Sequence, residues 1–179
     1  NENINKRQDK YGGNFENRHR ILDEIIDAVK LGSSNDMLIG VRLSGDEKEF
    51  QGIELQETIK IVEKLNQNKK IDYINVTAGT SAGLAGSTHI VPSMKFEAGY
   101  TIPLAKAIKG VTNKPVFLAG RINTPQIAEQ ALLNKAADMC GMTRAIISDP
   151  QMPQKAESGR LDEITACVGC NQACIGHML

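Results

Sequence analysis

Short apolar segments alternate with amphipathic segments along most of this chain. The apolar segments occupy residues 37–44, 73–77, 115–119 and 137–142, and short apolar runs of this kind are typical of buried strands. Between them, apolar residues recur three or four positions apart, which predicts helices that bury one face. Strands and helices that alternate in this order form parallel βα units, so the sequence predicts an α/β fold.

The first predicted helix follows a polar, turn-rich N-terminal segment. Asn14 is its candidate N-cap, and Gly32 is its candidate stop signal. Its apolar positions, which are spaced for one buried face, are Leu22, Ile25, Ile26 and Val29. We therefore expect this helix to pack through those side chains, with His19 on its polar side.

Later segments carry helix signals, either apolar positions at helical spacing or a proline near the first turn. They cover 55–65 and 102–108, the segment that starts at Thr124-Pro125, and the segment from Asp149-Pro150 to Gly159. Residues 78–93 are rich in glycine and serine, which predicts a loop after the second strand.

Composition and charge narrow the function classes. Hydrophobic residues make up 41% of the chain and charged residues 23%, which is ordinary for a globular domain with a buried core. The 21 basic and 21 acidic residues cancel, so no basic surface for nucleic acid is expected. No apolar run approaches the ~20 residues that cross a bilayer, and no signal-peptide pattern opens the chain. We therefore expect a cytoplasmic protein with no nucleic-acid or membrane partner.

Three of the four cysteines form one C-x2-C-x3-C run, made of Cys167, Cys170 and Cys174. A tight turn directs the thiolates of such a run at one centre, as in zinc sites and iron–sulfur clusters, whereas a bare C-x-x-C also suits a redox thiol pair. Zinc and cubane clusters normally take four protein ligands, and this run supplies three; His177, just past it, is not a strong candidate for the fourth. Cys140 lies in a predicted apolar strand, so we expect it to be a buried structural thiol.

The residues around this run resemble a known family. The sequence from Met142 to Cys174, and the pattern N-x-R-x-D-x-Y-G-G with N-R-x-R that begins at Asn5, are similar to the iron–sulfur branch of the Old Yellow Enzyme family of NADH:flavin oxidoreductases. This branch includes 2,4-dienoyl-CoA reductase and trimethylamine dehydrogenase. The resemblance covers nearly the whole chain and implies an FMN-binding (β/α)8 TIM barrel, a [4Fe-4S] cluster and a second nucleotide-binding region.

The resemblance also implies how much of that architecture the chain contains. Residues 1–160 are expected to be the C-terminal half of the TIM barrel, strands five to eight, with strands one to four upstream. Residues 161–179 are expected to begin the cluster-binding segment.

Site residues follow from the same resemblance. Active sites of (β/α)8 barrels lie at the carboxyl ends of the strands, often with a phosphate site after the last two. By resemblance, Gly120 with Arg121 and Thr143 with Arg144 bind the FMN phosphate, since glycine admits it close to the backbone and arginine supplies a forked cation. Arg42 is placed beside the isoalloxazine ring near N1 and O2, where its charge stabilises the anionic reduced flavin.

The residues alone leave another interpretation of these arginines open. An arginine at a strand end is usually solvated or salt-bridged. Because Arg42 lies within an apolar strand pattern, we expect an anionic partner to face it.

The implied cofactors are FMN and a [4Fe-4S] cluster held by Cys167, Cys170 and Cys174 with a fourth ligand downstream; FAD and NAD(P)H belong to a C-terminal region outside this chain. The implied reaction is NAD(P)H-dependent reduction of an activated, enoyl-type alkene. The alternative is amine dehydrogenation, in which electrons flow the opposite way.

The histidine that helps protonate substrate in dienoyl-CoA reductases falls near Ser81 here, so we assign no catalytic role to His89. A small-molecule substrate is expected, and a homo-oligomer is an open alternative.

A function of another class is a non-enzymatic module, in which a half-barrel with a zinc knuckle binds a partner. The arginines in flavin-site contexts argue against it. Zinc without iron or flavin would favour it, so metal analysis distinguishes the two classes.

Overall fold

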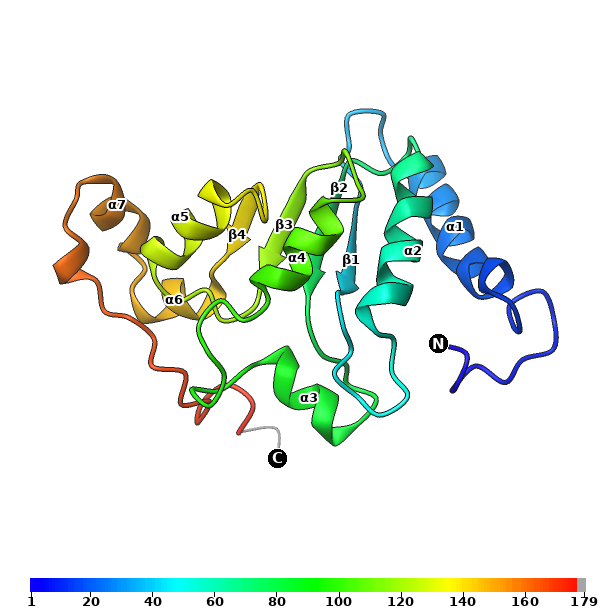
Figure 1. The fold of residues 1–179 in the computed structure, drawn as a ribbon. Helices are drawn as coiled ribbons and strands as arrows, with labels where there is room; N and C mark the ends of the chain where they lie inside the picture. The colour runs from blue at the N-terminus through cyan, green and yellow to red at the C-terminus, as the bar shows by residue number, and fades with distance from the viewer. Residues whose placement is uncertain (177–179) are drawn as a thin grey trace.

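The computed structural model describes residues 1–176 as one parallel sheet with helices packed mainly on one face (Figure 1). In chain order its elements are α1 (Phe15–Gly32), β1 (Gly40–Ser44), α2 (Leu55–Gln67), β2 (Tyr73–Thr77), α3 (Leu84–Ile90), α4 (Ile102–Lys109), β3 (Val116–Ala119), α5 (Pro125–Leu133), β4 (Met139–Gly141), α6 (Thr143–Ser148), α7 (Met152–Glu157) and the 3-10 turn η1 (Leu161–Glu163).

The four strands are all parallel and lie in the order β1-β2-β3-β4, so each strand pairs with the next one along the chain. Parallel neighbours need a crossover, and helices make these crossovers. The predicted α/β fold with parallel βα units is therefore confirmed. The strands point toward α3 and the C-terminal segment, which lie together at the lower edge of Figure 1.

Side chains that alternate along the strands form the main core with the covering helices. From β2 and β3 come Ile74, Val76, Val116 and Leu118, all fully buried. They pack against Val62 of α2, Leu104 and Ile108 of α4 and Ala131 of α5. Each aliphatic side chain of this size contributes about 1.5–3 kcal/mol when it leaves water, so this packed face holds the sheet together.

The opposite face of the sheet has no helical layer among the described residues. We call it the open face; in strand register it carries Arg42, Asn75, Phe117 and Met139. Tyr73 and Phe117 stack on it with ring centroids 4.6 Å apart. Parallel sheets are normally covered on both faces, so the open face is an incomplete layer.

Helix α1 packs through a narrower stripe than its sequence predicts. Ile26 is buried against Val41 of β1 and Leu65 of α2, whereas Ile25 and Val29 remain 52% and 46% exposed. The helix lies beyond α2, at the β1 end of the sheet, and therefore touches the core along one edge (Figure 1). His19, expected on the polar side, is instead buried, and its Nδ1 lies 3.0 Å from Asp23 Oδ2.

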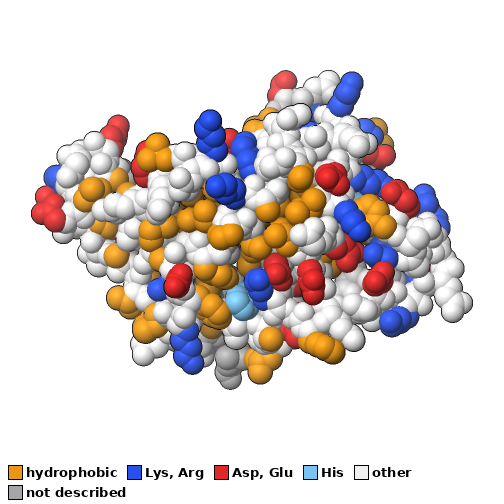
Figure 2. All heavy atoms as spheres, in the orientation of Figure 1, with side chains coloured by type: hydrophobic (Ala, Val, Ile, Leu, Met, Phe, Trp, Pro, Cys, Tyr) orange, Lys and Arg blue, Asp and Glu red, His pale blue; other side chains and the backbone are white. Residues whose placement is uncertain are grey.

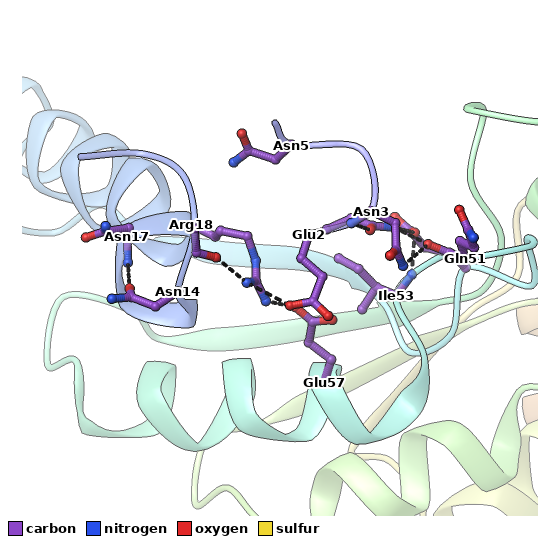
Figure 3. Close-up of polar contacts among 12 residues, drawn as sticks. Glu2, Asn3, Asn5, Asn14, Asn17, Arg18, Gln51, Ile53 and Glu57 are labelled. Atoms are coloured by element: carbon purple, nitrogen blue, oxygen red, sulfur yellow. Dashed lines mark hydrogen bonds and ion pairs between the residues drawn. The ribbon is translucent and has the colours of Figure 1, made fainter. Parts of the chain in front are cut away.

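The N-terminal segment is tied to α1 and α2 by polar contacts (Figure 3). Arg18 donates to Glu57 at 2.7 Å, to Glu2 at 3.2 Å and to the Gly13 carbonyl at 2.7 Å. Asn14 caps α1 as predicted, because its side chain accepts from the backbone N–H of Asn17 at 2.9 Å. These contacts fix where α1 begins.

Two short helices were not predicted. Helix α3 lies inside the expected loop 78–93, and α6 begins directly after β4. The carboxylate of Glu49 accepts from the Gly86 N–H inside α3 at 2.9 Å, so a distant loop stabilises this helix. Strands β1 and β4 are also shorter than the apolar segments that predicted them, residues 37–44 and 137–142.

Charged side chains of both signs are interspersed over the face seen in Figure 2, with hydrophobic side chains between them. No helix among residues 1–176 is long and apolar enough to cross a membrane.

Candidate functional site

A pocket of about 540 Å³ lies at the carboxyl ends of the four strands. Parallel strands end at one edge of a sheet, so residues that follow different strands meet there. The residues that line the pocket are Arg42, Thr77, Ala78, His89, Ile90, Val91, Pro92, Ala119, Gly120, Arg121, Ile122, Asn123, Gly141, Thr143, Arg144, Ile147, Cys167, Gly169, Ala173 and Cys174. The structure thus brings together every site residue named from the sequence except Cys170. Their roles toward a cofactor stay predictions.

The end of β3 makes a tight, left-handed turn. Gly120 has φ 143°, and a Cβ there would lie 2.5 Å from the side chain of Thr101, whose hydroxyl donates to the Gly120 carbonyl at 3.0 Å. Arg121 follows with φ 52°, an uncommon conformation for a residue with a side chain. Its Nε is buried without a hydrogen-bond partner among the described residues. Such a donor is costly unless a ligand or water accepts from it.

The end of β4 leads directly into α6, which begins with Thr143 and Arg144. Arg144 donates from Nη1 to the side-chain oxygen of Asn171 at 2.7 Å. Asn171 in turn donates from its amide nitrogen to the carbonyl of Val91, which follows α3. One side chain from the cysteine run therefore bridges the segments after β4 and β2.

The cysteine run crosses the pocket through further backbone contacts. The N–H of Met94 donates to the Gly169 carbonyl at 2.8 Å, and Asn123 donates to the Cys167 carbonyl at 3.2 Å. Gly169 is buried with φ 75°, and a Cβ on it would lie 2.3 Å from Arg121 Nη1. Glycine at this position therefore leaves room for the guanidinium of Arg121.

The thiols themselves are free and do not converge. Cys167 is half-buried, whereas Cys170 and Cys174 are exposed. Within residues 1–176, no three His, Cys, Asp or Glu side chains gather closely enough to hold a metal ion. His177 lies outside the described residues, so the ligand set stays a prediction. Cys140 is half-buried against the core, and burial raises the pKa of its thiol, as suits a structural cysteine.

The surroundings of Arg42 differ from those that the sequence predicted. It is exposed on the open face, and no carboxylate pairs with it among the described residues. The expected anionic partner is therefore not seen within this part of the chain. Its neighbour in register, Asn75, has a buried side-chain oxygen that also lacks a partner there.

The contact of His89 with Tyr100 beside the pocket was not predicted from the sequence. His89 Nδ1 lies 3.3 Å from the Tyr100 hydroxyl, which donates to the His89 carbonyl at 3.2 Å, and Phe96 packs on the imidazole ring at 4.4 Å. Burial lowers the pKa of His89 and raises the pKa of Tyr100 to about 12. Both groups therefore favour their neutral forms at pH 7. His89 belongs to α3 and Tyr100 to the turn before α4, so no local sequence pattern joined them.

Comparisons with known proteins agree with this geometry. A family model described as "NADH:flavin oxidoreductase / NADH oxidase family" matches residues 1–163. The chain is 39% identical over 172 residues to an NADH oxidase of Thermoanaerobacter brockii, and the match covers 96% of this chain and 26% of that protein.

Two solved structures are similar in fold over nearly the whole chain. One is a 2-naphthoyl-CoA reductase in complex with 2-naphthoyl-CoA, with a TM-score of 0.84, 31% identity, and coverage of 94% of this chain and 25% of that one. The other is a 6-hydroxypseudooxynicotine amine oxidase of Pseudomonas geniculata N1, which has the same TM-score and the same identity. That match covers 98% of this chain and 26% of the amine oxidase chain. The chain thus spans about a quarter of the length of each of these three proteins.

Proposed function

This chain belongs to the NADH:flavin oxidoreductase / NADH oxidase family of flavin-dependent oxidoreductases, and we propose that it forms the flavin-phosphate side of an FMN- and [4Fe-4S]-dependent enzyme. The observation that carries the proposal is the charge of the pocket. Its lining holds three arginines and, among the described residues, no carboxylate. A phosphate monoester is the ligand that such a site neutralises best.

The residues at the ends of β3 and β4 fit an FMN phosphate. Gly120 exposes backbone at a sharp turn, and the buried Nε of Arg121 lacks an acceptor within the described chain. Arg144 keeps further N–H donors beside the one that it gives to Asn171. Together the two guanidinium groups would offset the charge of a phosphate dianion.

Bound FMN would supply the hydride chemistry, while the residues of this chain would hold and tune it. Arg121 and Arg144 would anchor the phosphate, and Arg42, on β1 at the other end of the sheet, would present a fixed positive charge to the ring system. The apolar side chains of Ile122 and Ile147 line the same pocket and would exclude water from it.

For the [4Fe-4S] cluster, the donor chemistry fits but the described geometry does not yet form a site. All three thiols are free, and two of them border the pocket. They do not converge within residues 1–176. We therefore propose the three cysteines as ligands of the cluster, which would supply one-electron transfer.

The open face supports the proposal that this chain is half of a (β/α)8 barrel, strands five to eight. Residues 1–160 would form that half, and residues 161–179 would begin the cluster segment. Four strands in chain order with helices on one face are what half of such a barrel contains. A second half would cover the open face and pair with the two edge strands.

The reaction that we propose for the whole enzyme is NAD(P)H-dependent reduction of an activated, enoyl-type alkene. The likeness to a 2-naphthoyl-CoA reductase supports it. Amine oxidation is the second candidate, supported by an equal likeness to an amine oxidase. Both substrates are small molecules.

Cofactor analysis of the full-length protein, purified without oxygen, tests the proposal. We expect one FMN with about four iron and four sulfide per chain. Cys170→Ala should remove the iron and leave FMN bound, because the flavin site uses the strand ends. Stoichiometric zinc without iron or flavin would overturn the assignment and favour a binding module.

The direction of the reaction needs a separate assay. Reduced flavin prepared with NADH should be reoxidised by an enoyl thioester if the enzyme is an alkene reductase. Reduction of the oxidised flavin by a methylated amine, without NADH, would instead support the amine dehydrogenase alternative.

A further inference from the structure

We propose that Asn171, inside the cysteine run, is a positioning residue of the flavin-phosphate site. Its side-chain amide orients the guanidinium of Arg144 toward the pocket. The inference rests on the proposed function, since it requires Arg144 to meet the FMN phosphate. It concerns a residue outside the 1–163 segment that the family model matches.

Asn171 is placed so that both ends of its amide are used. The oxygen accepts from Arg144 Nη1 at 2.7 Å, and the nitrogen donates to the Val91 carbonyl. Among the described residues, Asn171 is the hydrogen-bond partner of the Arg144 side chain. A side chain held at both ends has little freedom to rotate, so it fixes where Nη1 of Arg144 lies.

The neutrality of the amide matters for this role. An amide oxygen accepts a hydrogen bond without cancelling the positive charge of Arg144. A carboxylate in its place would also hold the guanidinium, but it would neutralise it and repel a phosphate. The residue type at position 171 is therefore suited to orienting a cation that must still bind an anion.

The surrounding contacts keep Asn171 in place. The carbonyls of Gly169 and Cys167 accept from Met94 and Asn123, so the run is fixed on either side of the pocket. Asn171 itself has φ 60°, a left-handed conformation that asparagine adopts more readily than most residues.

The test is a double-mutant cycle in the full-length protein, read out as the dissociation constant of FMN added to flavin-depleted protein. Asn171→Gly removes the side chain at no cost for φ 60°, and Asn171→Asp replaces the amide with a charge. Both are made with and without Arg144→Ala. Gln172→Ala, an exposed neighbour in the same run, is the matched control.

We expect Asn171→Gly to weaken FMN binding about three- to tenfold, which lies within the range for loss of one typical intramolecular hydrogen bond. Asn171→Asp should weaken it more than Asn171→Gly. In the Arg144→Ala background, Asn171→Gly should cause no further loss. Gln172→Ala should bind FMN like the wild type, and the iron content of Asn171→Gly should be unchanged.

Equal losses from Asn171→Gly in both backgrounds would overturn the inference, because a purely structural role is independent of Arg144. An Asn171→Asp protein that binds FMN as tightly as the wild type would overturn it too. If Arg144→Ala alone leaves FMN affinity unchanged, the proposed phosphate site is wrong, a result separate from the behaviour of Asn171.

Discussion

At the scale of single residues, the three pocket arginines are held in different ways. Arg144 is oriented by an amide, Arg121 lies in space left by Gly169, and Arg42 stands exposed on the open face. The first two are therefore suited to anchoring a ligand, and the third to setting the local charge. This difference leads to different mutational predictions.

Arg144→Ala should weaken FMN retention more than tenfold. A charge-assisted contact is worth about 1.5–3 kcal/mol, and its loss leaves the phosphate with one guanidinium. The dissociation constant of FMN measures the effect. Arg160→Ala, which removes an exposed arginine paired with Glu163, is the control and should change nothing.

Arg42→Met should lower the reduction potential of bound FMN while leaving most of the flavin in place. A positive charge near the ring favours the anionic reduced form, so its loss disfavours reduction. Spectroelectrochemistry of the full-length protein measures the potential, and Arg42→Lys should retain most of it. A potential in Arg42→Met equal to that of the wild type contradicts this role.

At the scale of elements, Asp149 joins α6, α7 and the C-terminal segment. Its carboxylate accepts from Lys155 Nζ at 2.7 Å and from the N–H groups of Gln151 and Thr165 at 3.0 Å. The hydrogen bond from Lys155 lowers the pKa of Asp149 below its ordinary value.

We therefore predict a pH-dependent contribution from Asp149. A lowered carboxyl pKa stabilises the folded form above the unfolded pKa of about 3.9, and this stabilisation is lost as the pH falls through the folded pKa. Asp149→Asn should lower the thermal midpoint of the full-length protein at pH 7. The difference from the wild type should shrink toward pH 3; a constant difference would show that the charge is not involved.

The Arg18 contacts in Figure 3 predict a second effect at this scale. The Arg18 side chain is 11% exposed, and its removal leaves the Glu57 carboxylate, 28% exposed, without its cation. Arg18→Met should therefore lower the unfolding free energy by about 1–2 kcal/mol in urea titrations. Arg7→Met, which breaks an exposed pair with Asp9, should cost close to nothing.

Part of the fold and of the candidate site could be predicted from the sequence. The parallel sheet and the strand-end arginines followed from local periodicity and from the rule that parallel strands end together. Helix α3 could not be predicted in this way, because the side chain that stabilises it, Glu49, lies 37 residues before Gly86 in the sequence. The contacts of Asn171 with Arg144 and of His89 with Tyr100 join residues from different segments of the chain, and no local pattern encodes them.

At the scale of the whole molecule, the sheet has two edge strands, β1 and β4, and an open face. Exposed hydrophobic side chains flank both edges, including Leu38 at 70% and Ile147 at 73%. Unpaired edges and apolar surface of this kind favour association.

The 179-residue chain expressed alone should therefore self-associate. Sedimentation velocity over a concentration series should show dimers or larger species, whereas the full-length protein keeps one state. A monomer that unfolds cooperatively at high concentration would contradict the half-barrel proposal.

The way in which the cysteine run is attached has a consequence for assembly. Its hydrogen bonds to the pocket use backbone carbonyls and the amide of Asn171, and none of the described ones uses a sulfur atom of the run. Docking of the run and the proposed binding of a metal would thus be separate tasks, carried out by different atoms of the same eight residues. In the proposed cluster protein, the polypeptide would be a template that is in place before the inorganic group arrives, with all three thiols still available to receive it.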